Sequence, residues 1–139
     1  MIYYKIIPDK RLIIEYFDGT LTLDEMLRFV DSIRNDEHYD TTFNSLIDLS
    51  EVEMAVSTKE VQRYVTFLQK NSSLLENRKL AIITTTPNHV VTGTLYQLLG
   101  KDLPLNIRLY STFGAAVRWL GLFDFAFKDY TNIVKKIKE

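Results

Sequence analysis

The chain has 139 residues, of which 46% are hydrophobic and 25% are charged. That length suits one domain, and that composition excludes a disordered tail, a collagen-like fibre and a simple coiled coil. The 17 basic and 18 acidic residues nearly cancel, so no global field is present to hold a polyanion and we expect no nucleic-acid partner. Cysteine is absent, which excludes disulfides, thiolate catalysis and cysteine-based metal sites.

Targeting signals are not visible in the sequence. The first ten residues hold no basic region followed by a long apolar run, and no small-residue cleavage site follows them. The longest apolar stretches are well short of the ~18–20 residues that a membrane-spanning helix needs. We therefore expect a cytoplasmic protein without a transmembrane segment.

The first two elements are predicted to form an antiparallel hairpin. Ile2–Ile7 and Leu12–Phe17 are β-branched and aromatic runs, and the Pro8-Asp9-Lys10-Arg11 segment between them is typical of a turn. Asp18-Gly19 is expected to end the second strand.

A first helix is predicted over Leu23–Asn35. Thr22 and Glu25 have the spacing of a capping box, and apolar residues follow at helical intervals. A short strand, Leu46–Leu49, comes next.

Three further helices alternate with two strands. Ser57 and Glu60 form a second capping box, and the helix that they open leads to a compact apolar strand, Lys79–Thr84, of the type buried on both faces of a parallel sheet. Asn88 is predicted to cap the third helix, with Val91, Leu95, Leu98 and Leu99 facing inward and Gly100 ending it. The last strand, Ile107–Tyr110, precedes a core helix that Ser111-Thr112 begins and Gly121 ends.

The predicted order is β-β-α-β-α-β-α-β-α. A hairpin followed by α-β units favours the α/β class, with a mixed, mainly parallel sheet of four or five strands covered by helices. We expect residues 1–121 to form this domain and residues 122–139 to be an aromatic and basic extension of it.

The strand end Ile47-Asp48-Leu49-Ser50, together with the element order, resembles the STAS domains of anti-sigma-factor antagonists and sulfate transporters. In those domains an Asp-Ser-Ser-Gly-type loop begins the following helix and carries the phosphorylated serine. The resemblance places that switch at Ser57, but Val56 and Lys59 replace the family's Asp and Gly. It therefore implies a regulatory interaction module without the standard switch loop.

A closer resemblance is to standalone STAS-like proteins of bacteria. These typically have a glycine between the hairpin and the first helix, here Gly19, and a strand running into an aromatic-Ser-Thr helix start followed by Trp-Leu. The chain reads Tyr110-Ser111-Thr112 and Trp119-Leu120 at those places. The resemblance covers about residues 1–121 and specifies fold more than activity. The architecture also resembles the lipid-carrying CRAL-TRIO fold, which implies a small apolar ligand as an alternative.

Ser57 is a candidate phosphoacceptor, because a phosphate at a helix N-terminus meets free amides and the helix dipole. The structural alternative, which we favour, is a helix N-cap completed by Glu60.

Asp48 and Ser50 are candidate ligand- or partner-binding residues at the carboxyl end of a central strand, where open α/β sheets bind ligands. The favoured structural alternative is that Asp48 bonds to amides of a loop over Ser50–Glu53.

The Thr84–His89 segment is the most polar strand-to-helix crossing, and Thr85, Thr86, Asn88 and His89 could hold an anion at a switch-point edge. No glycine lets a phosphate approach the backbone there. We therefore favour a structural alternative in which the Thr and Asn side chains satisfy amides and His89 lies on the surface.

Catalytic and metal motifs are absent from the sequence. His38 and His89 lie about fifty residues apart with no metal-ligand spacing, and no nucleophile elbow, P-loop or dinucleotide-binding pattern occurs. We expect no cofactor, no metal and no enzymatic activity.

The C-terminal segment is rich in aromatic residues. Phe123, Phe127, Tyr130 and Val134 share one helical face, whereas Phe123, Phe125 and Phe127 also fit strand alternation. These aromatic side chains either pack on their own domain, or they act as oligomer contacts through Phe123, Phe125, Phe127 and Tyr130. Weak membrane-surface binding through Lys135-Lys136 is a more distant alternative.

Three functional hypotheses follow, in this order. The first is a non-enzymatic cytoplasmic interaction module, a homodimer or the binder of another protein. The second is a carrier or sensor of a small apolar or anionic ligand. The third is an enzyme of unknown chemistry.

Overall fold

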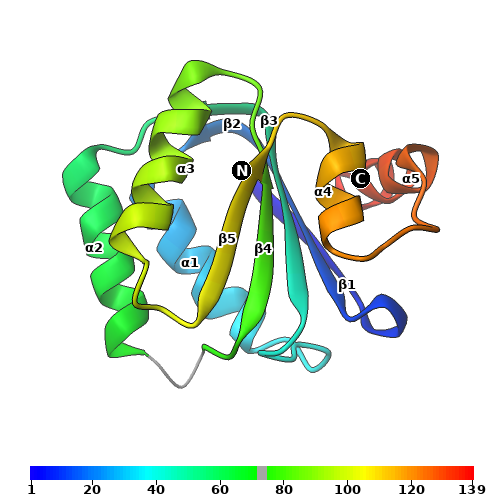
Figure 1. The fold of residues 1–139 in the computed structure, drawn as a ribbon, viewed down its shortest axis with the longest axis horizontal. Coiled ribbons are helices and arrows are strands. Elements are labelled where there is room, and N and C mark those ends of the chain that lie inside the picture. The colour runs from blue at the N-terminus through cyan, green and yellow to red at the C-terminus, as the bar shows by residue number, and fades with distance from the viewer. Residues whose placement is uncertain (72–74) are drawn as a thin grey trace.

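A single five-stranded sheet with helices on both faces organises the chain (Figure 1). The structure is a computed structural model that describes residues 1–71 and 75–139. The strands are β1 (Ile2–Ile7), β2 (Leu12–Leu21), β3 (Asn44–Met54), β4 (Arg78–Ile83) and β5 (Leu105–Tyr110). The helices are α1 (Leu23–Arg34), α2 (Thr58–Lys70), α3 (Pro87–Leu99), α4 (Phe113–Trp119) and α5 (Phe127–Ile137), and a single 3-10 turn (Pro8–Lys10) joins β1 to β2.

The strands lie side by side in chain order, β1-β2-β3-β4-β5. The first pair is antiparallel and the other three pairs are parallel, which confirms the predicted mixed sheet and the N-terminal hairpin. Each crossover advances the sheet by one strand in the same direction, so α1, α2 and α3 cover the same face (Figure 1). The strand order never reverses, and the prediction of a switch point at residues 84–89 was therefore wrong.

The second face of the sheet is covered by the end of the chain. Helix α4 packs on β4 and β5, and α5 packs near β1. The side chains of Phe125 and Tyr130 are buried there beside Leu12 and Ile14. The helix begins only at Phe127, so Phe123 does not share its face as predicted.

Strands β2 and β3 run further than the sequence indicates. Asp18-Gly19 does not end β2, which continues to Leu21 past a shift in register, and Gly19 adopts a φ of 68° there. Residues 50–53 lie in β3, where Glu51 pairs with Asp18, instead of forming the predicted loop. The extension arises because each strand supplies the other's hydrogen-bond partners, a condition that neither stretch reveals alone.

Helix α3 is rotated relative to its prediction. It begins at Pro87 with Thr86 as N-cap, so Asn88 is not the cap. Gly93 faces the sheet so closely that a Cβ there would lie 2.8 Å from the Leu109 side chain. That contact turns Val91 and Leu98 outward, where both are exposed, contrary to the prediction that they face inward.

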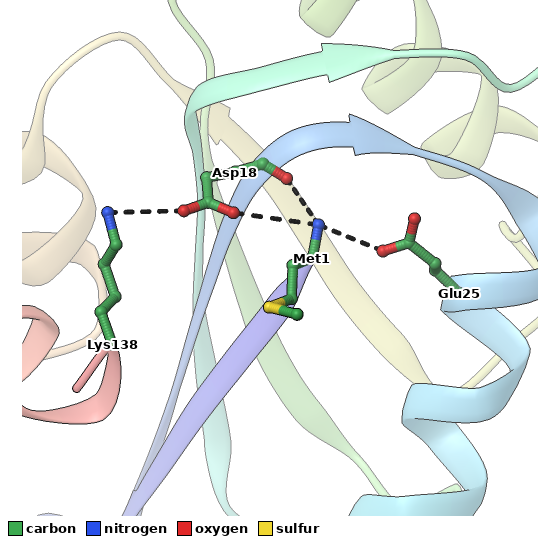
Figure 2. A network of polar contacts seen from close by, with 4 residues as sticks. All are labelled: Met1, Asp18, Glu25 and Lys138. Atoms are coloured by element: carbon green, nitrogen blue, oxygen red, sulfur yellow. Dashed lines mark hydrogen bonds and ion pairs between the residues drawn. The ribbon is translucent and has the colours of Figure 1, made fainter.

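Asp18 connects the two ends of the chain (Figure 2). The Met1 amino group donates to the Asp18 carbonyl at 2.6 Å and lies 3.1 Å from Glu25 Oε2. Lys138 Nζ lies 3.4 Å from Asp18 Oδ2. Because the Glu25 carboxylate is directed to Met1, only the Thr22 half of the predicted first capping box forms, with the Glu25 amide donating to Thr22 Oγ1 at 3.3 Å.

Candidate functional site

A cavity of about 120 Å³ lies between the sheet and helices α1, α2 and α3. Most of its lining is apolar, and the sheet and each of the three helices contribute to it. The sheet contributes Ile13, Phe17, Ile47, Leu49, Leu80 and Ile82, and the helices contribute Met26, Phe29, Val30, Ile33, Val61, Leu68 and Gly93.

One acidic side chain, Glu15, lies among these apolar groups. Strand alternation places it on the same face of β2 as Ile13 and Phe17, and only 8% of its surface is exposed. Burial raises the pKa of the Glu15 carboxyl, and the positive charge of Arg78 and the Ser45 hydroxyl oppose that shift only in part. The neutral carboxyl is therefore favoured more strongly in the cavity than in water.

Arg78 supplies a cation to the same cavity from the first position of β4. Its Nη1 donates to Ser45 Oγ at 2.9 Å and to the Phe43 carbonyl at 3.3 Å. Its Nε is buried and has no acceptor among the residues that the structure describes. A buried donor without an acceptor loses the free energy of a hydrogen bond, so this N–H is the least satisfied polar group of the site.

Three tyrosines complete the polar lining. Tyr39 follows α1, Tyr64 belongs to α2 and Tyr96 belongs to α3. The rings of Tyr64 and Tyr96 pack edge to face, with their centroids 5.7 Å apart. Burial raises the pKa of all three phenols; the positive charge of Arg78 partly opposes that rise, and Glu15 adds to it. The phenols are thus neutral hydrogen-bonding groups that share one electrostatic environment with Arg78 and Glu15.

The cavity can accept a small molecule. Its volume is close to that of an engineered cavity of about 150 Å³ that binds benzene. Apolar walls with a few convergent polar groups are typical of small-molecule sites, where the walls supply affinity and the polar groups set orientation.

Asp48 lies outside this cavity, in a structural network on the other side of the sheet. Its Oδ1 accepts from the Ser50 amide at 2.9 Å, and its Oδ2 accepts a hydrogen bond from the Tyr130 hydroxyl. Burial and the Asp48 carboxylate raise the pKa of Tyr130. The network joins α5 to β3.

The polar crossing after β4 is also internally satisfied. His89 is 1% exposed, so the prediction of a surface histidine was wrong. Its Nδ1 accepts from the Thr85 amide at 3.1 Å and its Nε2 lies 2.7 Å from the Val52 carbonyl. Thr85 Oγ1 donates to the Ser50 carbonyl at 3.3 Å. Hydrogen bonds from this segment thus hold the start of α3 against β3, and both ring nitrogens of His89 have a hydrogen-bond partner.

The remaining polar candidates lie at helix starts. Ser57 forms the predicted capping box, accepting from the Glu60 amide at 3.2 Å while the Ser57 amide donates to Glu60 Oε1 at 3.0 Å. Thr86 accepts from the His89 amide at 3.2 Å, and Asn88 is exposed on the first turn of α3. None of these three residues lines the cavity.

The sequence reasoning missed Glu15 and Arg78. Glu15 had a visible signal, since it is the one charged residue within the apolar strand Leu12–Phe17. Arg78 had less, because it lies directly before the strand predicted to start at Lys79. Only the pairing of β2, β3 and β4 brings the two residues to one cavity.

Two structural findings bear on partners. None of the helices in residues 1–71 and 75–139 is long and apolar enough to cross a membrane. Within the same residues, no group of three or more histidine and acidic side chains is placed to hold a metal ion.

The fold itself is recognisable among solved structures. An uncharacterised protein of the DUF3478 family from Shewanella loihica PV-4, described as having a SpoIIAA-like fold, matches with a TM-score of 0.55 at 16% sequence identity. The match covers 86% of this chain and 92% of that one. The chain has a SpoIIAA-like, that is STAS-like, fold. At this identity the likeness concerns fold alone, and neither a family model nor a curated protein matches the sequence.

Proposed function

We propose that the protein is a carrier or sensor that binds a small, mainly apolar ligand in the cavity beneath α1, α2 and α3. The observation that carries the proposal is a cavity of about 120 Å³ with apolar walls and a buried polar cluster. Interiors are normally packed to the density of organic crystals, so an opening of this size is a feature that needs a role. This order reverses the ranking made from the sequence, which placed an interaction module first.

The proposal is tested by filling the cavity from one wall. Val61 and Val65 are both buried on one side of α2, one turn apart, but only Val61 lines the cavity. With toluene as the probe, wild-type protein is expected to show saturable NMR shifts in residues that line the cavity. Val61→Phe is expected to abolish those shifts, because the new ring occupies the space.

Val65→Phe is the matched control. It places the same ring in a filled part of the core, where overpacking costs about 1–3 kcal/mol. Toluene binding should persist in this variant, and its stability should fall below that of Val61→Phe. Absence of saturable toluene binding to wild-type protein, or equal destabilisation by the two substitutions, would contradict the proposal.

A second candidate function is protein interaction, including self-association. It is favoured by the exposed aromatic side chains of Phe123 and Phe127, which have 80% and 60% of their surface accessible. Phe125 and Tyr130, which the sequence also suggested as oligomer contacts, are buried within their own domain. We propose that any self-association uses Phe123 and Phe127.

A further inference from the structure

The polar groups of the cavity indicate the chemical class of its ligand. The inference rests on the proposed function, because it concerns the same cavity. Arg78 is the central group, since both hydrogen bonds that it donates within the described residues come from Nη1. Arg78 lines the cavity, and its Nε is buried without an acceptor among the described residues.

The Nε edge of an arginine matches a carboxylate. Its N–H groups lie in one plane at the spacing of the two carboxylate oxygens, so one ligand group can accept two parallel hydrogen bonds. Such a contact would satisfy the buried Nε donor, which a purely apolar ligand would leave unpaired at a cost in affinity.

The charge of the cavity lining favours a monoanion. Arg34 also lines the cavity, but its guanidinium pairs with Asp31 on the same helix. Glu15 is in no ion pair among the described residues, and its raised pKa favours the uncharged form, which donates a hydrogen bond. Arg78 is thus the one arginine of the lining that is in no ion pair among the described residues.

We propose that the ligand is a small apolar monocarboxylate, bound with its carboxylate at Arg78 and its apolar part between the sheet and α1–α3. Glu15 and the cavity-lining tyrosines Tyr64 and Tyr96 are the neutral donors around the carboxylate. The ligand is of benzoate or hexanoate size, because the cavity of about 120 Å³ accepts little more.

The test uses probes that share an apolar part and differ in charge. Wild-type protein is titrated at constant pH and ionic strength with benzoate, toluene and benzylammonium, and with hexanoate, hexan-1-ol and hexylammonium, and binding is followed by NMR shifts of cavity residues. The carboxylate of at least one series is expected to bind about tenfold or more tightly than its uncharged partner, because it adds charge-assisted hydrogen bonds. The ammonium probes are expected to bind most weakly.

Variants of Arg78 separate the contribution of its positive charge from that of the paired N–H groups on its Nε edge. Arg78→Met is expected to remove the advantage of the carboxylate while toluene and hexan-1-ol still bind. Arg78→Lys keeps the charge but loses the Nε edge, and it is expected to lose most of the advantage. Arg78→Lys also serves if the Met variant does not fold, and the comparison of probes on wild-type protein needs no variant.

Three outcomes would overturn the inference. If uncharged probes bind and carboxylates do not, the cavity is a ligand site but the inference is wrong and the proposed function stands. If ammonium probes bind best, the Glu15 carboxylate and not Arg78 selects the ligand. If no probe of either series binds, both the inference and the proposed function fail.

Discussion

At the scale of single residues, Glu15 shows how a strand can bury a carboxyl group. The run Leu12–Phe17 is buried on both faces, so no position in it leads to solvent, and alternation sends residue 15 towards α1–α3. Burying an unpaired carboxylate is costly, and the group responds by holding its proton. Its position in a cavity therefore reduces stability at neutral pH, which is common where a site is shaped for binding.

Glu15→Gln should stabilise the protein, and by more as the pH rises. Because the pKa of Glu15 is raised in the folded state, the unfolded chain releases the proton first, at the ordinary value near 4.5. Between that value and the folded pKa, the free energy of unfolding of the wild-type protein falls with rising pH. The total loss is about 1.4 kcal/mol for each unit by which folding raises the pKa of Glu15. Glutamine has no proton to release. The difference in stability between the variant and wild type should therefore appear above about pH 4.5 and increase with pH up to the folded pKa of Glu15.

Urea unfolding of both proteins at a series of pH values between 4 and 8 measures this difference. Glu53→Gln, at an exposed position of β3, is the control and should follow the wild-type profile. Parallel stability profiles for wild type and Glu15→Gln would show that burial of Glu15 does not shift its pKa.

At the scale of elements, the sequence predicted what short-range chemistry decides. The hairpin, the Ser57 capping box and the Thr112 cap each depend on residues within a few positions, and all three form. The length of β3 and the rotation of α3 depend instead on partners more than ten residues away. For His89, the decisive group is the Val52 carbonyl at the far end of β3, so its burial was not visible in the Thr84–His89 segment.

Ser57→Ala should lower the free energy of unfolding by about 0.5–2 kcal/mol, because the Glu60 amide loses its acceptor at the start of α2. Ser57→Asp should keep most of the stability, since aspartate is also a good N-cap. Thr58→Ala, at the exposed first position of the helix, is the matched control and should change stability little. Urea unfolding at pH 7 compares the variants, and a Ser57→Ala protein as stable as the control would show that the cap contributes nothing.

At the scale of the whole molecule, topology explains why the C-terminal segment packs as it does. Because successive strands are added to the same edge of the sheet, α1, α2 and α3 all lie on one face. The other face would be open to solvent without α4 and α5. Phe125 and Tyr130 close that face, and the hydrogen bond from Tyr130 to Asp48 connects α5 to the middle strand. The sequence indicated that these aromatic residues needed burial but not which of them would receive it.

The exposed members of that segment give a test of self-association. Phe123 lies between α4 and α5, and the ring of Phe127 packs against Phe113 at 5.3 Å while much of its surface stays accessible. If two copies meet through these side chains, Phe123→Ser/Phe127→Ser should weaken the dimer by about tenfold or more in sedimentation equilibrium, because two buried aromatic contacts are lost.

Val91→Ser/Leu98→Ser is the matched control, since it removes two exposed apolar side chains from α3, a helix on the opposite face of the sheet. This pair should leave the association unchanged if the C-terminal segment is the interface. The reverse pattern, in which only the α3 pair dissociates the protein, would move the interface to α3. A wild-type protein that stays monomeric at every accessible concentration would end the self-association proposal but leave ligand binding untouched, because Phe123 and Phe127 do not line the cavity.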